Sequence, residues 1–265
     1  MRNIRLIIEY DGTGFNGWQT QERTSAQAHP IPQGYGAGKG TSKRVKTIQG
    51  EIEKAGKKLL GNKISLTGAS RTDSGVHAKA QAANFRTDSN LPLYNIKNGL
   101  NSLLPRTISI VSAEEAALNF HSRFDSKSKL YKYTIVSRKS RSPLLEKHAA
   151  YFSYDLNISA MRKACRYLLG KKDFRSFQTS DKKEKDSIRT VKKIEIVSRP
   201  PLVEIYVQAD GFLYNMVRNI AGTLMEIGRG RFKPETVKEI LEKKHRPSAG
   251  QTAPAKGLCL ERVFY

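Results

Sequence analysis

The chain of 265 residues contains only two cysteines, Cys165 and Cys259, and they stand far apart. Two cysteines are too few for a disulfide framework, and their spacing fits no common zinc motif. No apolar run approaches the length of a membrane span, and the first residues lack the apolar core and cleavage site of a secretory signal. These absences favour a soluble protein of a reducing compartment, the cytoplasm.

Acidic residues are also scarce. The sequence holds 24 Asp and Glu against 47 Lys and Arg, which gives a formal net charge of +23 at pH 7. Repulsion of this size is best tolerated when a polyanion neutralises it, and a phosphate backbone is the usual partner. An anionic membrane surface would call for a basic amphipathic helix or a lipid-attachment motif, and neither is present. The charge therefore favours a nucleic-acid partner and no membrane.

Apolar periodicity predicts two similar halves. In the first half it predicts two helices, at 47–60 and 93–104, and strands at 4–10, 63–70, 78–87 and 107–113. In the second half it predicts helices at 158–168, at 213–224 and from Pro234, and strands at 129–137, 189–198, 202–209 and 257–265. The order βαββαβ is typical of ferredoxin-like and RNA-recognition folds.

The predicted fold class is therefore α+β, with two ferredoxin-like halves, mainly antiparallel sheets and a catalytic cleft between the halves. We expect an N-terminal half over 1–113 and a C-terminal half over 114–265. Clefts of this kind often hold binding or catalytic sites. Within the first half, prolines and closely spaced glycines over 23–46 predict a long flexible insertion.

Three patterns resemble cofactor or metal sites but fail in detail. Gly12, Gly14 and Gly17 have the spacing of a dinucleotide fingerprint, yet no helix is predicted after them, so we expect a glycine-rich turn. In the run GAGKGTS, Lys39 is followed by glycine, where a P-loop needs serine or threonine. The five histidines show no ligand spacing. We expect no metal and no small-molecule cofactor.

The segment GASRTDSGVHA places one acid, Asp73, among small and basic residues. An aspartic protease needs two carboxylates that share a proton, and Arg71 would oppose such sharing. Asp73 could instead cap a turn by accepting the amides of Gly75 or Val76. It could also be a nucleophile acting on a nucleic acid, held ionised by an arginine. The residue pattern alone leaves these last two interpretations open.

The same segment closely resembles the Arg-Thr-Asp-x-Gly-Val-His-Ala motif of the TruA family of tRNA pseudouridine synthases. Five further stretches resemble the family in order: EYDGTGFNGWQTQ (9–21), TIQGEIEKA (47–55), RFDSKSKLYKYTI (123–135), GFLYNMVRNIAGTLMEIGRG (211–230) and AGQTAPAKGLCLERVFY (249–265). Ordered motifs over nearly the whole chain are far more specific than any single one.

The resemblance implies an isomerase that needs neither cofactor nor metal. It would convert uridines 38, 39 and 40 of the tRNA anticodon stem–loop to pseudouridine, working as a homodimer. The alternative on the same fold is a non-catalytic RNA-binding protein or RNA chaperone, in which Asp73 is merely structural. Only the chemistry of the site residues separates the two functions.

The resemblance also assigns roles to four residues. Asp73 would be the nucleophile, and Arg218 its salt-bridge partner, which should keep the pKa of Asp73 low. Tyr131 would stack on the target uracil, although its spacing also suits a core tyrosine. Arg71 would fill the space of the flipped base or hold the RNA backbone, and it could also pair with Asp73.

The chain departs from the family pattern between Gln21 and Thr47, where it is longer. This stretch carries the basic residues Arg23, Lys39, Lys43, Arg44 and Lys46. It could be a mobile arm that orders on tRNA, or a tolerated surface insertion, and the sequence favours neither. Ser70 and Ser74 stand where the family pattern has Gly and Ala, and their small size should preserve the local geometry.

Overall fold

The structure is a computed structural model that describes residues 1–20, 46–179 and 186–265. Except for Lys46, the insertion predicted over 23–46 lies outside these residues. The strands are β1 (Arg2–Tyr10), β2 (Thr67–Gly68), β3 (His77–Thr87), β4 (Ile108–Ala116), β5 (Ser128–Ser137), β6 (Ala150–Phe152), β7 (Gly170–Asp173), β8 (Ile188–Arg199), β9 (Leu202–Ala209) and β10 (Leu258–Phe264). The helices are α1 (Ile48–Leu60), α2 (Leu93–Leu103), α3 (Ile158–Leu168), α4 (Met216–Gly228) and α5 (Thr236–Lys243).

The strands form one continuous sheet in the order β4-β1-β3-β10-β5-β9-β8-β7. Strand β2 pairs with β3, and β6 pairs with β5. Among the strands of the described residues, only the β10–β3 and β5–β6 pairs are parallel. The predicted α+β class with a mainly antiparallel arrangement is therefore confirmed, and the sheets of the two halves prove to be a single sheet.

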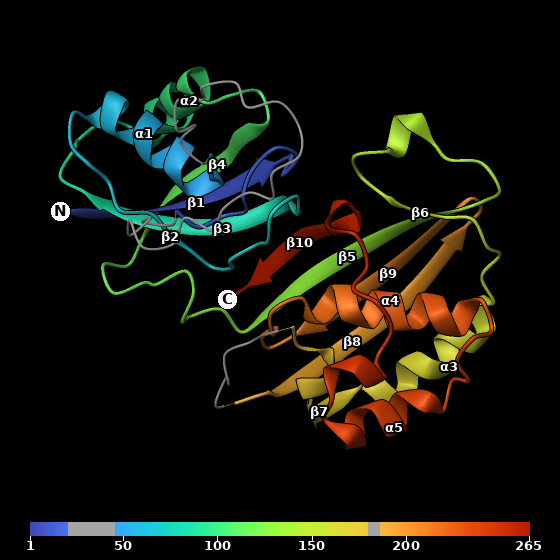
Figure 1. The fold of residues 1–265 in the computed structure, drawn as a ribbon. Coiled ribbons are helices and arrows are strands. Elements are labelled where there is room, and N and C mark those ends of the chain that lie inside the picture. The colour runs from blue at the N-terminus through green and yellow to red at the C-terminus, as the bar shows by residue number, and fades with distance from the viewer. Residues whose placement is uncertain (21–45, 180–185) are drawn as a thin grey trace, which may run out of the picture.

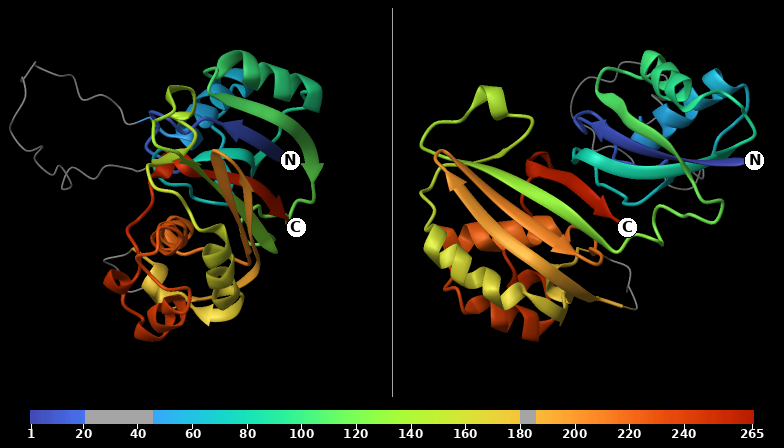
Figure 2. Two further views of the ribbon diagram at one scale, coloured as in Figure 1. Left: turned by 90° about the vertical axis from the view of Figure 1, so that its right-hand side faces the viewer. Right: turned by 180° about the vertical axis from the view of Figure 1, so that it is seen from behind.

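Each half repeats one strand order. The first half runs β4-β1-β3-β2 and the second half runs β10-β5-β9-β8. In each half, the last strand in the sequence (β4 or β10) therefore lies beside the first (β1 or β5). Strand β10 lies between β3 and β5 and joins the two halves (Figures 1 and 2). A division of the chain near residue 113 stays a prediction.

The helices cover each half separately. Helices α1 and α2 gather against the N-terminal strands, α3 and α4 gather against the C-terminal strands, and α5 packs against α3 (Figure 1). Helix α1 begins where its sequence predicts, because the Thr47 hydroxyl accepts the amide of Gly50 as an N-cap. Among the described residues, no helix is long and apolar enough to cross a membrane.

Two of the element boundaries that differ from prediction have local causes. The strand expected over 63–70 shrinks to β2, because side chains of α1 bind the backbone of Leu66: its amide donates to Glu53 and its carbonyl accepts from Gln49. Helix α4 begins at Met216 instead of Leu213. Asn215, just before it, has a left-handed backbone with φ of 60°, which cannot continue a helix.

Candidate active site

The loop between β2 and β3 carries Asp73, and the glycine-rich turn after β1 holds this loop. Tyr10 Oη lies 2.7 Å from the Thr72 hydroxyl, and the Trp18 amide donates to the Thr72 carbonyl at 3.0 Å. A Cβ on Gly12 would lie 2.0 Å from the Val76 carbonyl oxygen. The glycines thus permit close backbone approach, and the expected turn is confirmed, with no helix in the described residues up to Thr20.

The Asp73 carboxylate takes no part in capping this turn. The amide of Val76 donates to the backbone carbonyl of Asp73 at 3.1 Å, so the turn closes without the side chain. The carboxylate instead faces Arg218, with 3.7 Å between Oδ2 and Nη1. Both side chains are partly buried. The carboxylate is therefore left available for chemistry.

Arg218 lies in the first turn of α4 and is held on several sides. Its Nε donates to the Ala253 carbonyl at 2.8 Å, and its Nη1 donates to Asn215 Oδ1 at 2.6 Å. The Ala253 amide in turn donates to the Arg218 carbonyl at 3.2 Å. Sequence reasoning missed Asn215 and Ala253, although both lie in stretches quoted above for their family likeness. These contacts fix the guanidinium before any substrate arrives.

Tyr131 extends from β5 and is buried beside the Asp73 loop. Its hydroxyl lies 2.7 Å from Ser70 Oγ, and its ring meets Phe212 edge-on, with 5.1 Å between centroids. Burial raises the pKa of Tyr131, so the phenol stays protonated at neutral pH. Ser70, a departure from the family pattern, therefore serves as the hydroxyl partner of Tyr131.

A cleft of about 560 Å³ opens above these groups and takes lining from both halves. Asp73 and Tyr131 line it, together with Leu258 of β10. The cleft lining has two acidic residues, Asp73 and Asp210. Its basic residues are more numerous: Arg71, Arg123, Lys129 and Arg189. Arg71 is exposed and, within the described part of the chain, forms no ion pair, so the pairing with Asp73 considered above is wrong. The cleft suits an anionic ligand.

The pKa of Asp73 is raised, contrary to the expectation that a cation would keep it low. Burial between the two halves is the largest cause, because it penalises the charged form. The Arg218 guanidinium lowers the pKa of Asp73 but does not outweigh burial. The arrangement therefore holds a carboxylate that is poorly solvated and has one cation beside it.

Comparison with known proteins agrees with this geometry. The family model described as tRNA pseudouridine synthase matches residues 34–125 and 164–265. The chain belongs to this family. It is 45% identical to tRNA pseudouridine synthase A 2 of Clostridium perfringens and 44% identical to tRNA pseudouridine synthase A of Caldicellulosiruptor bescii, in both cases over the full length of each chain. As a tRNA pseudouridine synthase it is an isomerase that modifies tRNA.

The synthase also brings together Asp11, His77 and His148, a group that sequence reasoning missed. Their ligand atoms lie within 4.8 Å of one another, which suits a metal ion. However, the Gly12 amide donates to His77 Nδ1 at 3.1 Å, so the lone pair facing Asp11 is already engaged. We interpret the group as a contact between the segment before β6 and the end of β1, and the expectation of no metal stays a prediction.

His77 gives the synthase a testable pH dependence. Burial lowers the pKa of His77, with Asp11 opposing and His148 reinforcing this effect. When the pH is lowered below the ordinary histidine pKa of about 6.5, His77 takes up a proton in the unfolded chain more readily than in the folded chain. The free energy of unfolding therefore decreases as the pH decreases. We expect the free energy of unfolding to fall by at most about 1.4 kcal/mol per pH unit from this residue.

Urea unfolding between about pH 7.5 and pH 5 measures this slope, with His77→Gln as the comparison. In this pH range, the free energy of unfolding of the variant should change less steeply with pH than that of the wild type. Asp11 does not interfere, because its pKa is lowered and it titrates in more acidic solution. Equal slopes for the wild type and the variant would contradict the prediction.

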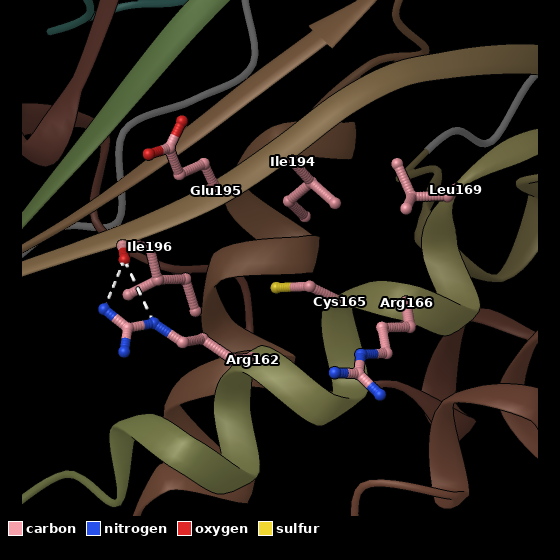
Figure 3. Close-up of a pocket in the computed structure, with 7 residues that line it drawn as sticks. All are labelled: Arg162, Cys165, Arg166, Leu169, Ile194, Glu195 and Ile196. Carbon is pink, nitrogen blue, oxygen red and sulfur yellow. Dashed lines mark hydrogen bonds between the residues drawn. The ribbon is translucent and has the colours of Figure 1, made fainter.

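A second, smaller hollow of about 350 Å³ lies between α3 and β8 of the synthase (Figure 3). Arg162 closes one side by donating from Nε and Nη2 to the Ile196 carbonyl, as the dashed lines show. Cys165 lines the hollow, but burial raises the pKa of its thiol to about 12, so no thiolate nucleophile forms there. The hollow contains none of the predicted site residues.

Proposed function

We propose that the chain isomerises uridines 38, 39 and 40 of the tRNA anticodon stem–loop, with Asp73 as the nucleophile. The observation that carries the proposal is the Asp73 carboxylate itself. It faces a basic cleft, is paired with a fixed arginine and is not consumed in capping its own turn. A merely structural aspartate would be expected to bind the amides of its turn.

The proposed reaction moves one bond within the substrate. The uridine flips out of its stack into the cleft, since Asp73 cannot reach a base inside a helix. Asp73 attacks either the ribose anomeric carbon or the uracil ring, and the glycosidic C–N bond breaks. The freed uracil rotates and its carbon five bonds to the ribose. Asp73 departs, the proton on carbon five is released to solvent, and the former glycosidic nitrogen takes up one proton. One proton is lost and one is gained, so the product is an isomer of the substrate.

The surrounding residues support this chemistry in distinct ways. The Arg218 guanidinium stabilises the Asp73 carboxylate before attack, at 3.7 Å. The neutral Tyr131 lies in the same cleft, where its ring can contact the uracil. Arg71 is exposed beside the nucleophile, so it can hold the RNA backbone or occupy the space that the flipped base leaves. These roles match those that the family resemblance implies.

Substrate recognition would depend on shape and phosphates more than on base edges, because three neighbouring uridines must reach one site. The net charge of +23 supports this mode. We further propose a cytoplasmic homodimer with tRNA spanning both subunits. Sedimentation velocity of the free protein tests the dimer, and a single species with the monomer mass would exclude it.

A tRNA transcript with uridine at positions 38, 39 and 40 tests the proposed specificity. Carbodiimide labelling followed by reverse transcription should stop at these positions after incubation with the protein. A matched transcript with cytidine at the same positions should give no such stops. Tight binding of the first transcript without any stop would instead favour the non-catalytic RNA-binding alternative.

A further inference from the structure

Two large aromatic side chains at the cleft are exposed to solvent. Phe124, between β4 and β5, is 76% exposed, and Tyr214, between β9 and α4, is 53% exposed. Both line the cleft that contains Asp73. Leaving such rings in water gives up the burial free energy that aromatic residues usually contribute to a fold. Their position in the cleft that contains Asp73 indicates that a ligand covers them.

The local structure holds Phe124 in place while leaving part of its ring open. The amide of Phe124 donates to His121 Nδ1 at 3.2 Å, and the two rings stack with 4.2 Å between centroids. Asp125 closes the same turn by accepting the His121 amide at 2.9 Å. The Arg123 guanidinium lies 5.9 Å from the Phe124 ring centroid. Phe124 is therefore pre-positioned beside a cation.

The backbone around Tyr214 is equally well fixed. Its carbonyl accepts the Thr179 amide at 3.1 Å, and the next residue, Asn215, has the left-handed backbone that precedes α4. Leu213, on the other side, is buried in the core. The main chain is thus anchored on both sides of Tyr214, whereas its side chain lines the cleft and is about half exposed.

We propose that Phe124 and Tyr214 are stacking platforms for the bases that flank the target uridine. This inference rests on the proposed function, in which one base leaves the stack and its neighbours lose a stacking partner. Aromatic faces take any base, and the adjacent cations bind phosphates, as in other sites for single-stranded RNA. Such tolerance is what an enzyme acting on several adjacent uridines requires.

Binding of a fluorescent anticodon stem–loop RNA tests the platforms. Phe124→Ala and Tyr214→Ala should each weaken binding by about fivefold to 150-fold. Tyr94→Ala is the matched control, because Tyr94 is 75% exposed on α2 and does not line the cleft; its affinity should equal that of the wild type. Phe124→Tyr should restore binding, since it keeps an aromatic face.

The salt dependence of binding separates stacking from charge. Phe124→Ala should leave the slope of log affinity against log salt unchanged, because it removes no phosphate contact. Arg123→Gln should reduce that slope by about one. Wild-type affinity in both aromatic variants would overturn the proposal, and so would a change of oligomeric state with unchanged RNA affinity per subunit.

Photocrosslinking locates the contact directly. RNAs with 5-iodouridine on either side of the target uridine should cross-link to Phe124 or Tyr214, as mapped by mass spectrometry. Cross-links confined to other residues would overturn the inference even if pseudouridine forms. Conversely, cross-links at these rings without any pseudouridine would refute the proposed function and leave the stacking platforms in place.

Discussion

Replacing Asp73 with asparagine is expected to reduce pseudouridine formation by about 10⁴-fold or more, because the substitution removes the only nucleophile proposed for the cleft. Tritium release from tRNA labelled at carbon five of uracil measures this loss. The variant should still bind tRNA with nearly wild-type affinity, since the basic residues of the cleft are untouched. A rate within tenfold of the wild type would exclude Asp73 as the nucleophile.

The same variant should be more stable than the wild type at neutral pH. Because the pKa of Asp73 is raised in the folded chain, its ionised form costs stability above that pKa. The cost vanishes as the pH falls below about 3.9, where the unfolded chain is protonated as well. Thermal unfolding should therefore give Asp73→Asn the higher Tm at neutral pH, with a difference that shrinks in acid.

Replacing Arg218 with glutamine is expected to lower kcat/KM at neutral pH by about 10²-fold to 10³-fold, as for the loss of other pre-positioned electrostatic groups. Without the guanidinium, burial acts on Asp73 unopposed and raises its pKa further. The acid limb of the kcat/KM profile should move to higher pH, and part of the lost activity should return in alkaline solution.

Arg218→Lys is the matched control for charge without the guanidinium geometry. It keeps a cation near Asp73, but one amine cannot reproduce the separate Nε and Nη1 bonds to Ala253 and Asn215. Its acid limb should lie between those of the wild type and Arg218→Gln. If both variants kept the wild-type profile, Arg218 would act on folding or RNA binding and not on Asp73.

Local rules explain why most elements could be predicted from the sequence. Helix α1 begins after Thr47 and ends before Gly61, whose φ of 77° suits a helix C-cap, and both signals stand beside the apolar repeat. The alternating pattern of β9 is matched by alternating burial along Leu202–Ala209. Each of these elements depends on neighbours within a few positions.

The parts that sequence reasoning missed depend on distant residues. Spacing alone made Arg71, two positions from Asp73, a plausible partner, whereas the partner in the structure is Arg218, which only the family resemblance indicated. The sequence led us to expect a low pKa for Asp73, because it shows that a charged partner is present. It does not show how far residues from both halves bury the carboxylate. His148 meets His77 for the same reason: the topology brings their segments together, and no short-range pattern records it.

The position of β10 also has a consequence for protein synthesis. Ribosomes make Leu258–Phe264 after every other strand described, yet this segment separates β3 from β5 and contributes Leu258 to the cleft. A nascent chain that has not reached residue 258 therefore leaves two strand edges unpaired and lacks part of the cleft lining. We expect such a chain to complete its sheet only when Leu258–Phe264 leaves the ribosome.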